Sequence, residues 1–185
     1  MTGISEPWLR KYINEKYKNV PRKIKTVKKG RIIIKFDEMR SFVGMKANKQ
    51  WIWLAIDMDS REIAGIFVGS RNRSGAEGLW KSLPPVYRQC AVRYTDFRAS
   101  YEEVFPKKRH RPVGKDSGGI NRIERFNYML RRRISLLVRK TLSFSKKIEN
   151  RIGTIWNFIH HYNGSDLGQG HYFLRTTRLF INLDR

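Results

Sequence analysis

Two apolar segments joined by a short turn limit most strongly what this chain can fold into. In "WIWLAIDMDSREIAGIFVG" the segments 51–57 and 62–68 are apolar on both faces, and Asp59-Ser60-Arg61 supplies the turn. A strand that is apolar on both faces belongs inside a sheet that other elements cover on each side. The sequence therefore predicts a sheet built around this hairpin, with a layer of helices on either face.

The remaining elements extend this sheet. Further strands are predicted at 31–37 and 91–96 and, more weakly, at 109–113, and helices at 1–20, 74–83, 98–105, about 120–139 and 145–162. The first three strands are linked too closely for helical crossovers and should be antiparallel, whereas the last two follow helices and should be parallel. We expect an α/β fold with a mixed sheet, helices on both faces and an additional N-terminal helix.

The basic charge is concentrated in two blocks. The chain has 39 Lys and Arg against 16 Asp and Glu, a net charge of +23. Residues 1–35 contain 11 of the basic residues and two acids, and residues 107–140 contain 12 and two. A polyanion that crosses both blocks explains this distribution, and DNA fits better than a membrane surface because the blocks alternate with buried strands. A basic surface that is merely solvated is the alternative.

Other classes are excluded by composition. The single cysteine, Cys90, rules out an internal disulfide framework and a CxxC zinc site. No apolar run approaches the roughly 18 residues of a membrane span, and the N-terminus has no signal-peptide core. We therefore expect no membrane partner and a cytoplasmic location, associated with the nucleoid if DNA is the partner.

Three acids occupy positions where such a fold gathers ligands. Asp37 ends the first predicted strand, Asp96 ends the fourth, and Glu124 lies in the first turns of the long helix after the fifth. With no base nearby, three carboxylates would repel one another, and Mg²⁺ or Mn²⁺ would relieve that cost. Two such ions about 3.5–4 Å apart catalyse in-line phosphodiester displacement. Glu38 points away from Asp37 in an extended chain, and Asp57 is expected to be structural.

Each acid also has a purely structural interpretation. Asp37 could cap a turn, Asp96 could cap the short helix that follows it, and Glu124 could simply favour a helix N-terminus. The coincidence of all three favours a metal site.

Basic residues around Glu124 are candidates for phosphate contacts. Arg131, two helical turns after Glu124, shares its face with Asn127 and Tyr128. The predicted DNA-binding set is Arg131, Arg122, Arg125, Arg132, Lys115 in the loop 114–119, and His110. A solvated arginine-rich helix is the alternative for the outer arginines, and an exposed position without contact is the alternative for His110.

Several blocks of sequence resemble the transposases of the insertion sequence one family. They are "FDEMRSFVGMKANKQWIWLAID", "YTDFRASYEEVFP", "RHRPVGKDSGGINRIERFNYMLRRR" and "RKTLSFSKKIENRIGTIWNFIHHYN", from about Phe36 to Asn163. The resemblance implies a ribonuclease H-like core of the DDE class, with Asp37, Asp96 and Glu124 as catalytic metal ligands and Arg131 as the basic residue after the Glu. This chain departs from the family pattern at two positions. The family tends to have an aromatic residue where Arg40 stands and a Gly where Phe97 stands.

The resemblance also suggests how the chain is divided. Residues 1–30 resemble the end of a helix-turn-helix followed by a basic linker, residues 31–165 the catalytic domain, and residues 166–185 a C-terminal tail. Family members have a zinc-finger-like segment upstream, and no cysteine pair precedes the first helix here. We expect that an upstream reading frame supplies that part, or that the chain is a truncated copy.

The predicted function is therefore DNA transposition. Asp37, Asp96 and Glu124 would hold two Mg²⁺ or Mn²⁺ ions, the element ends (terminal inverted repeats) would be cleaved, and these would be joined to target DNA. A homodimer or higher oligomer on DNA is implied by the resemblance. The alternatives are a ribonuclease H-like nuclease that cuts without joining, and a DNA-binding protein without catalysis, such as an element repressor or an inactive remnant.

Overall fold

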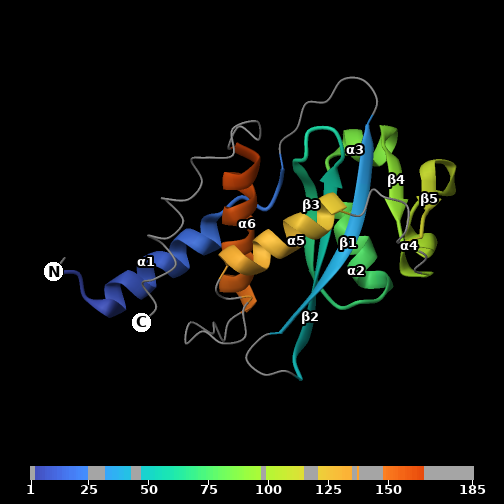
Figure 1. Ribbon diagram of the computed structural model, residues 1–185. Helices are drawn as coiled ribbons and strands as arrows, with labels where there is room; N and C mark the ends of the chain where they lie inside the picture. The colour runs from blue at the N-terminus through green and yellow to red at the C-terminus, as the bar shows by residue number, and fades with distance from the viewer. Residues whose placement is uncertain are drawn as a thin grey trace. The chain divides into compact units, whose positions relative to one another are not determined.

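The computed structural model describes residues 3–24, 32–42, 47–96, 99–114, 121–134, 137 and 148–164. They belong to two compact units, one spanning Lys23–Leu130 and the other Met1–Arg22 together with Arg131–Arg185. The domain boundaries expected from the sequence remain a prediction. Figure 1 labels the elements: α1 Glu6–Asn19, β1 Ile33–Phe42, β2 Lys49–Asp57, β3 Ile63–Gly69, α2 Arg73–Ser82, α3 Pro85–Cys90, β4 Val92–Thr95, α4 Ala99–Val104, the 3₁₀ turn η1 Lys107–Arg109, β5 His110–Pro112, α5 Asn121–Arg133 and α6 Ile148–Gly164.

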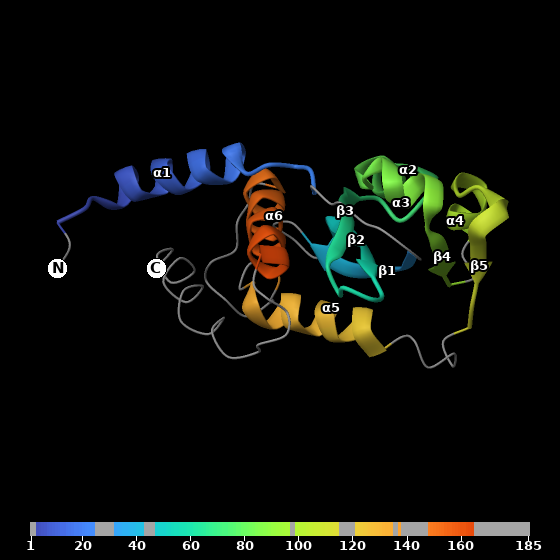
Figure 2. The ribbon, with the colours of Figure 1, turned by 90° about the horizontal axis from the view of Figure 1, so that it is seen from above.

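The unit Lys23–Leu130 is built on one five-stranded sheet in the order β3-β2-β1-β4-β5. β1, β2 and β3 pair antiparallel, and β4 and β5 pair parallel to β1 and to each other. Figure 2 shows α2, α3 and α4 on one face of the sheet and α5 on the other. The predicted α/β fold, a ribonuclease H-like mixed sheet with covered faces, is confirmed, as is the N-terminal helix.

The two faces of β1 are chemically different. Ile34 and Phe36 join an aromatic core with Trp53, Tyr101 and other buried residues below α2, α3 and α4. The intervening residues Lys35, Asp37 and Met39 point to the α5 face because successive strand residues alternate. One face of β1 is thus almost wholly apolar up to Phe36, and the other carries charge.

β1 is longer than the sequence predicts. The predicted strand ended at Asp37, but β1 continues to Phe42 because β2 pairs with it along its whole length, from Ile34↔Asp57 to Phe42↔Lys49. β4 pairs only with Ile33–Lys35. Asp37 therefore lies in the middle of β1, just beyond the last β4 pair, rather than at the strand end.

A short helix, α3, is absent from the elements that the sequence predicts. Pro84-Pro85 was expected only to stop the preceding helix, but Pro85 is the first residue of α3. Proline is favoured at the first position of a helix because its missing N–H has no partner there in any case. Pro84-Pro85 therefore separates α2 from α3, and Pro85 begins α3.

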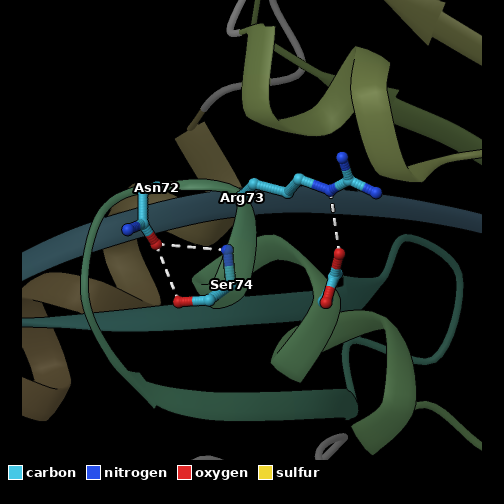
Figure 3. Close-up of polar contacts among 4 residues, drawn as sticks. Asn72, Arg73 and Ser74 are labelled. Atoms are coloured by element: carbon cyan, nitrogen blue, oxygen red, sulfur yellow. Dashed lines mark hydrogen bonds and ion pairs between the residues drawn. The ribbon is translucent and has the colours of Figure 1, made fainter.

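The turns of this unit are fixed by side-chain caps. Asn72 caps α2: its side-chain oxygen accepts from the Ser74 backbone N–H at 3.1 Å and from the Ser74 hydroxyl at 2.8 Å (Figure 3). One turn on, Arg73 Nε donates to Glu77 at 2.9 Å. The bond from the Ser74 backbone N–H to Asn72 satisfies one of the backbone groups that a helix start leaves unpaired.

Asp57 is structural, as the sequence predicts. Its Oδ1 accepts from the backbone N–H groups of Asp59 and Ser60 at 3.0 Å, which closes the β2–β3 turn. Its Oδ2 accepts from the Tyr87 hydroxyl of α3 at 2.9 Å. A buried carboxylate is retained here because it is hydrogen-bonded to the turn and to α3.

In the second unit α1 packs against α6. A Cβ added at Gly153 of α6 would lie 2.5 Å from the Tyr17 Cβ, so the two helices approach too closely there for a larger residue. Asn150 Nδ2 donates to Asn14 Oδ1 at 2.8 Å across the same pair. Within the described residues no helix combines the length and apolar character needed to cross a membrane.

Candidate active site

Asp37 is half-buried on the α5 face of β1, opposite Leu54 of β2. Its Oδ2 accepts a hydrogen bond of 2.6 Å from the Asn127 side-chain amide of α5. This bond joins residues 90 positions apart. The first predicted ligand is therefore attached to the helix that carries the third.

Asp96 is the first residue after β4 and is also partly buried. The register of the parallel pair, Ile33↔Val92 to Lys35↔Tyr94, brings position 96 level with position 37 when it is extended by two residues. Alternation along β4 assigns Asp96 to the same face as Tyr94, which pairs with Lys35. The register therefore aligns the first two predicted ligands on adjacent strands.

Glu124 lies in the first turn of α5 and is exposed. Ile123, Phe126 and Leu130 of α5 are buried. The sequence groups Asn127 and Tyr128 with Glu124 on one helical face, but the structure separates them: Asn127 is 8% exposed, and Tyr128 is 65% exposed. They flank Glu124 because residues adjacent in a helix point about 100° apart.

Lys35 is a buried charged residue near the candidate acids that the sequence pattern did not single out. It lies two residues before Asp37 on the same face of β1 and is only 6% exposed. Burial lowers the pKa of its ammonium group, while the charges of Asp37 and Glu124 raise it. The expectation that the acids have no base nearby is therefore wrong. A lysine inside the apolar run "RIIIKF" was the available signal.

Glu38 faces the opposite side of the sheet, as predicted, but it is buried there. Its side chain is 1% exposed and lies 3.5 Å from the Arg71 guanidinium, which stacks over the Trp51 ring at 3.7 Å from the centroid. Burial raises the pKa of Tyr101 well above its usual range, and the neighbouring Glu38 carboxylate raises it further. Glu38 thus belongs to the aromatic side of the sheet rather than to the Asp37 site.

His110 is an interior residue of β5. It is 7% exposed, its Nε2 lies 2.7 Å from the Thr95 hydroxyl, and its ring packs edge-on against Phe105. Burial and the positive charge of Arg93 lower its pKa, which favours the neutral ring. This environment, in place of the exposed position expected from the sequence, leaves His110 little surface with which to contact a phosphate.

The arginines of α5 are accessible. Arg125, Arg131 and Arg132 are exposed on this helix. Lys115 and the side chain of Arg122 lie outside the described residues, as does Phe97. The accessible members of the predicted DNA-binding set are therefore all on the helix that carries Glu124.

The chemistry of the site suits a hard divalent cation. Asp37, Asp96 and Glu124 offer oxygen ligands, the type that Mg²⁺ and Mn²⁺ prefer. Asn127 adds a buried side-chain oxygen, Oδ1, that has no hydrogen-bond partner among the described residues. The structure does not bring Asp37, Asp96 and Glu124, or any other three His, Cys, Asp or Glu side chains of the described residues, into one group that could hold a metal ion.

A family model and individual relatives both relate this chain to proteins of IS1 elements. Residues 31–163 match the model of the family described as IS1 transposase. The chain is 34% identical over 131 residues to the iso-IS1n protein InsB of Shigella dysenteriae, covering 71% of this chain and 96% of that protein. It is 31% identical over 133 residues to the IS1 protein InsB of Shigella flexneri, covering 71% and 98%. This chain belongs to the IS1 transposase family.

Proposed function

We propose that this chain is a DDE-type transposase that cleaves the ends of an insertion sequence and joins them to target DNA. Asp37, Asp96 and Glu124 hold two Mg²⁺ or Mn²⁺ ions. When bound, the ions supply Lewis-acid stabilisation and an activated nucleophile for in-line phosphodiester transfer. The carboxylates fix the cations, and the neighbouring arginines hold the phosphates on either side of the scissile bond.

One observation carries this proposal: the hydrogen bond from Asn127 to Asp37. It couples the central strand to α5, three residues from Glu124, and so supports a site shared by acids that lie 87 positions apart in sequence (124 − 37). The parallel register of β1 and β4 supports Asp96 as the third member.

A strand-transfer assay tests the function directly. The purified chain is incubated with Mn²⁺, a labelled duplex that carries the DNA flanking its own gene, and plasmid target. We expect a cleaved element end followed by a joined product. Cleavage without joining would identify a nuclease instead, and binding with neither product would identify a non-catalytic DNA-binding protein. We further propose that a homodimer or higher oligomer assembles on the two ends, which sedimentation with and without end DNA measures.

The arginines of α5 make a separate prediction about binding. Arg131→Ala should weaken binding to all duplexes and reduce the slope of log K against log[salt] by about 1, because one phosphate contact is lost. Fluorescence anisotropy at several salt concentrations measures this slope. Arg73→Ala is the matched control, because Arg73 is exposed but pairs with Glu77 on α2. An unchanged slope for Arg131→Ala, or an equal change in the control, would contradict the assignment.

A further inference from the structure

Burial and charge fix the orientation of the hydrogen bond between Asn127 and Asp37. Asn127 is buried, and its Nδ2 donates to Asp37 Oδ2 at 2.6 Å. A bond from an amide to a charged carboxylate is stronger than one between neutral groups. If the amide were reversed, Asn127 Oδ1 would face the Asp37 carboxylate, and two oxygens would repel each other. The contact therefore fixes both the amide and the carboxylate that it holds.

Lys35 acts on the same carboxylate in a different way. It lies on the same face of β1, two residues away, and is buried. A buried ammonium is costly unless negative charge is close to it. Burial lowers the pKa of Lys35, and the charges of Asp37 and Glu124 partly offset this. Lys35 therefore places a buried basic side chain on the face of β1 that carries Asp37.

We propose that Asn127 and Lys35 are positioning residues that act on metal binding in opposite directions. Asn127 holds Asp37 in the orientation in which it binds the cation, and so increases affinity. Lys35 balances the acids before any cation arrives, and so keeps the empty site assembled but lowers affinity for a divalent ion. This inference rests on the proposed function only in taking Asp37 and Glu124 as ligands.

The opposite signs follow from simple electrostatics. Loss of an oriented contact to a ligating carboxylate typically weakens metal binding by about 10–100-fold. Loss of a like charge near the cation removes a repulsion, and in a partly buried site that strengthens binding by about tenfold. General damage to the fold would weaken binding in both cases, so the signs distinguish the proposal from destabilisation.

Titration of the full chain with Mn²⁺ alone, without DNA, tests the inference. Free Mn²⁺ is followed by its electron paramagnetic resonance signal, so no activity is needed. Asn127→Leu and Asn127→Ala should both bind Mn²⁺ about 10–100-fold more weakly. The first keeps the side-chain volume and the second reduces it, so a shared loss is due to the amide. Lys35→Met should bind about tenfold more tightly.

Two variants serve as matched controls. Asn157→Leu removes an exposed amide from α6, and Lys81→Met removes an exposed charge from α2. Both should bind Mn²⁺ as the parent chain does. Thermal unfolding without metal checks that each variant is folded.

The outcomes separate this inference from the proposed function. If the parent chain binds Mn²⁺ in a way that depends on Asp37, but the Asn127 variants bind equally well or Lys35→Met binds more weakly, the inference is wrong and the metal site stands. If the parent chain does not bind Mn²⁺, or if Asp37→Asn binds equally well, the metal assignment fails and the inference fails with it.

Discussion

Replacing Asp96 with asparagine should reduce strand transfer by about 10³-fold or more while leaving affinity for DNA within about twofold. A bound cation contributes several kcal/mol of transition-state stabilisation, and each 1.36 kcal/mol is worth a factor of ten in rate. Asparagine keeps the size of the side chain but loses the charge that holds the cation. The basic residues that hold the phosphates are unchanged, so DNA binding should persist.

Single-turnover strand transfer in saturating protein separates these effects, with anisotropy as the measure of binding. Asp59→Asn is the matched control, because Asp59 is an exposed acid in the β2–β3 turn of the same unit. The control should join strands at the parental rate. Strand joining by Asp96→Asn at more than about a tenth of the parental rate would mean that Asp96 is not a metal ligand.

Gly75→Val should destabilise the sheet unit by about 3 kcal/mol. A Cβ at Gly75 would meet the Ser70 carbonyl oxygen and would lie 2.5 Å from Trp53 Nε1. Those two groups form a hydrogen bond of 2.9 Å, so the new side chain would force apart the contact that attaches the β3–α2 connection to β2. Overpacking of this kind costs about 1–3 kcal/mol, and the lost hydrogen bond adds about 1 kcal/mol.

Urea unfolding followed by tryptophan fluorescence measures this change, since Trp53 is fully buried. Gly164→Val is the control, because a Cβ at Gly164 meets nothing within 4 Å. A shift in the urea midpoint for Gly75→Val no larger than for the control would show that the helix can move away from Trp53 at little cost.

The sequence predicts the sheet well because runs of apolar residues mark its strands. The hairpin 51–57 and 62–68 and the mixture of antiparallel and parallel pairs follow from apolar runs and from the length of the connections. The end of β1 does not follow, since the residues after Phe36 are mostly polar. They stay in the strand because the backbone of β2 pairs with them, which no local pattern reveals.

The candidate site is predictable in part for the same reason. Acids that follow an apolar run or lie at a helix start are visible in sequence, so Asp37, Asp96 and Glu124 can be selected. The partners of Asp37 cannot be selected in this way. Lys35 is read as a charge in an apolar run, and Asn127 as one polar residue on a basic helix, until the fold buries both beside the carboxylate. Long-range burial, rather than residue type, determines their role.

Asp37 and Glu38 are adjacent in β1 and point to opposite faces of the sheet. The pairing of β1 with β2 therefore determines which of the two acids faces α5. A slip of β1 against β2 by one residue would exchange the faces of Asp37 and Glu38, because side chains in a strand alternate. The product would still be a paired hairpin, but Asp37 would face the aromatic side of the sheet and would no longer face α5 and Asn127. The nine residue pairs from Ile34↔Asp57 to Phe42↔Lys49 therefore fix the face of the sheet on which Asp37 lies. Since these pairs are local in sequence and the β1–β4 pairs span 59 positions (92 − 33), the hairpin register is expected to form before Asp96 is brought alongside.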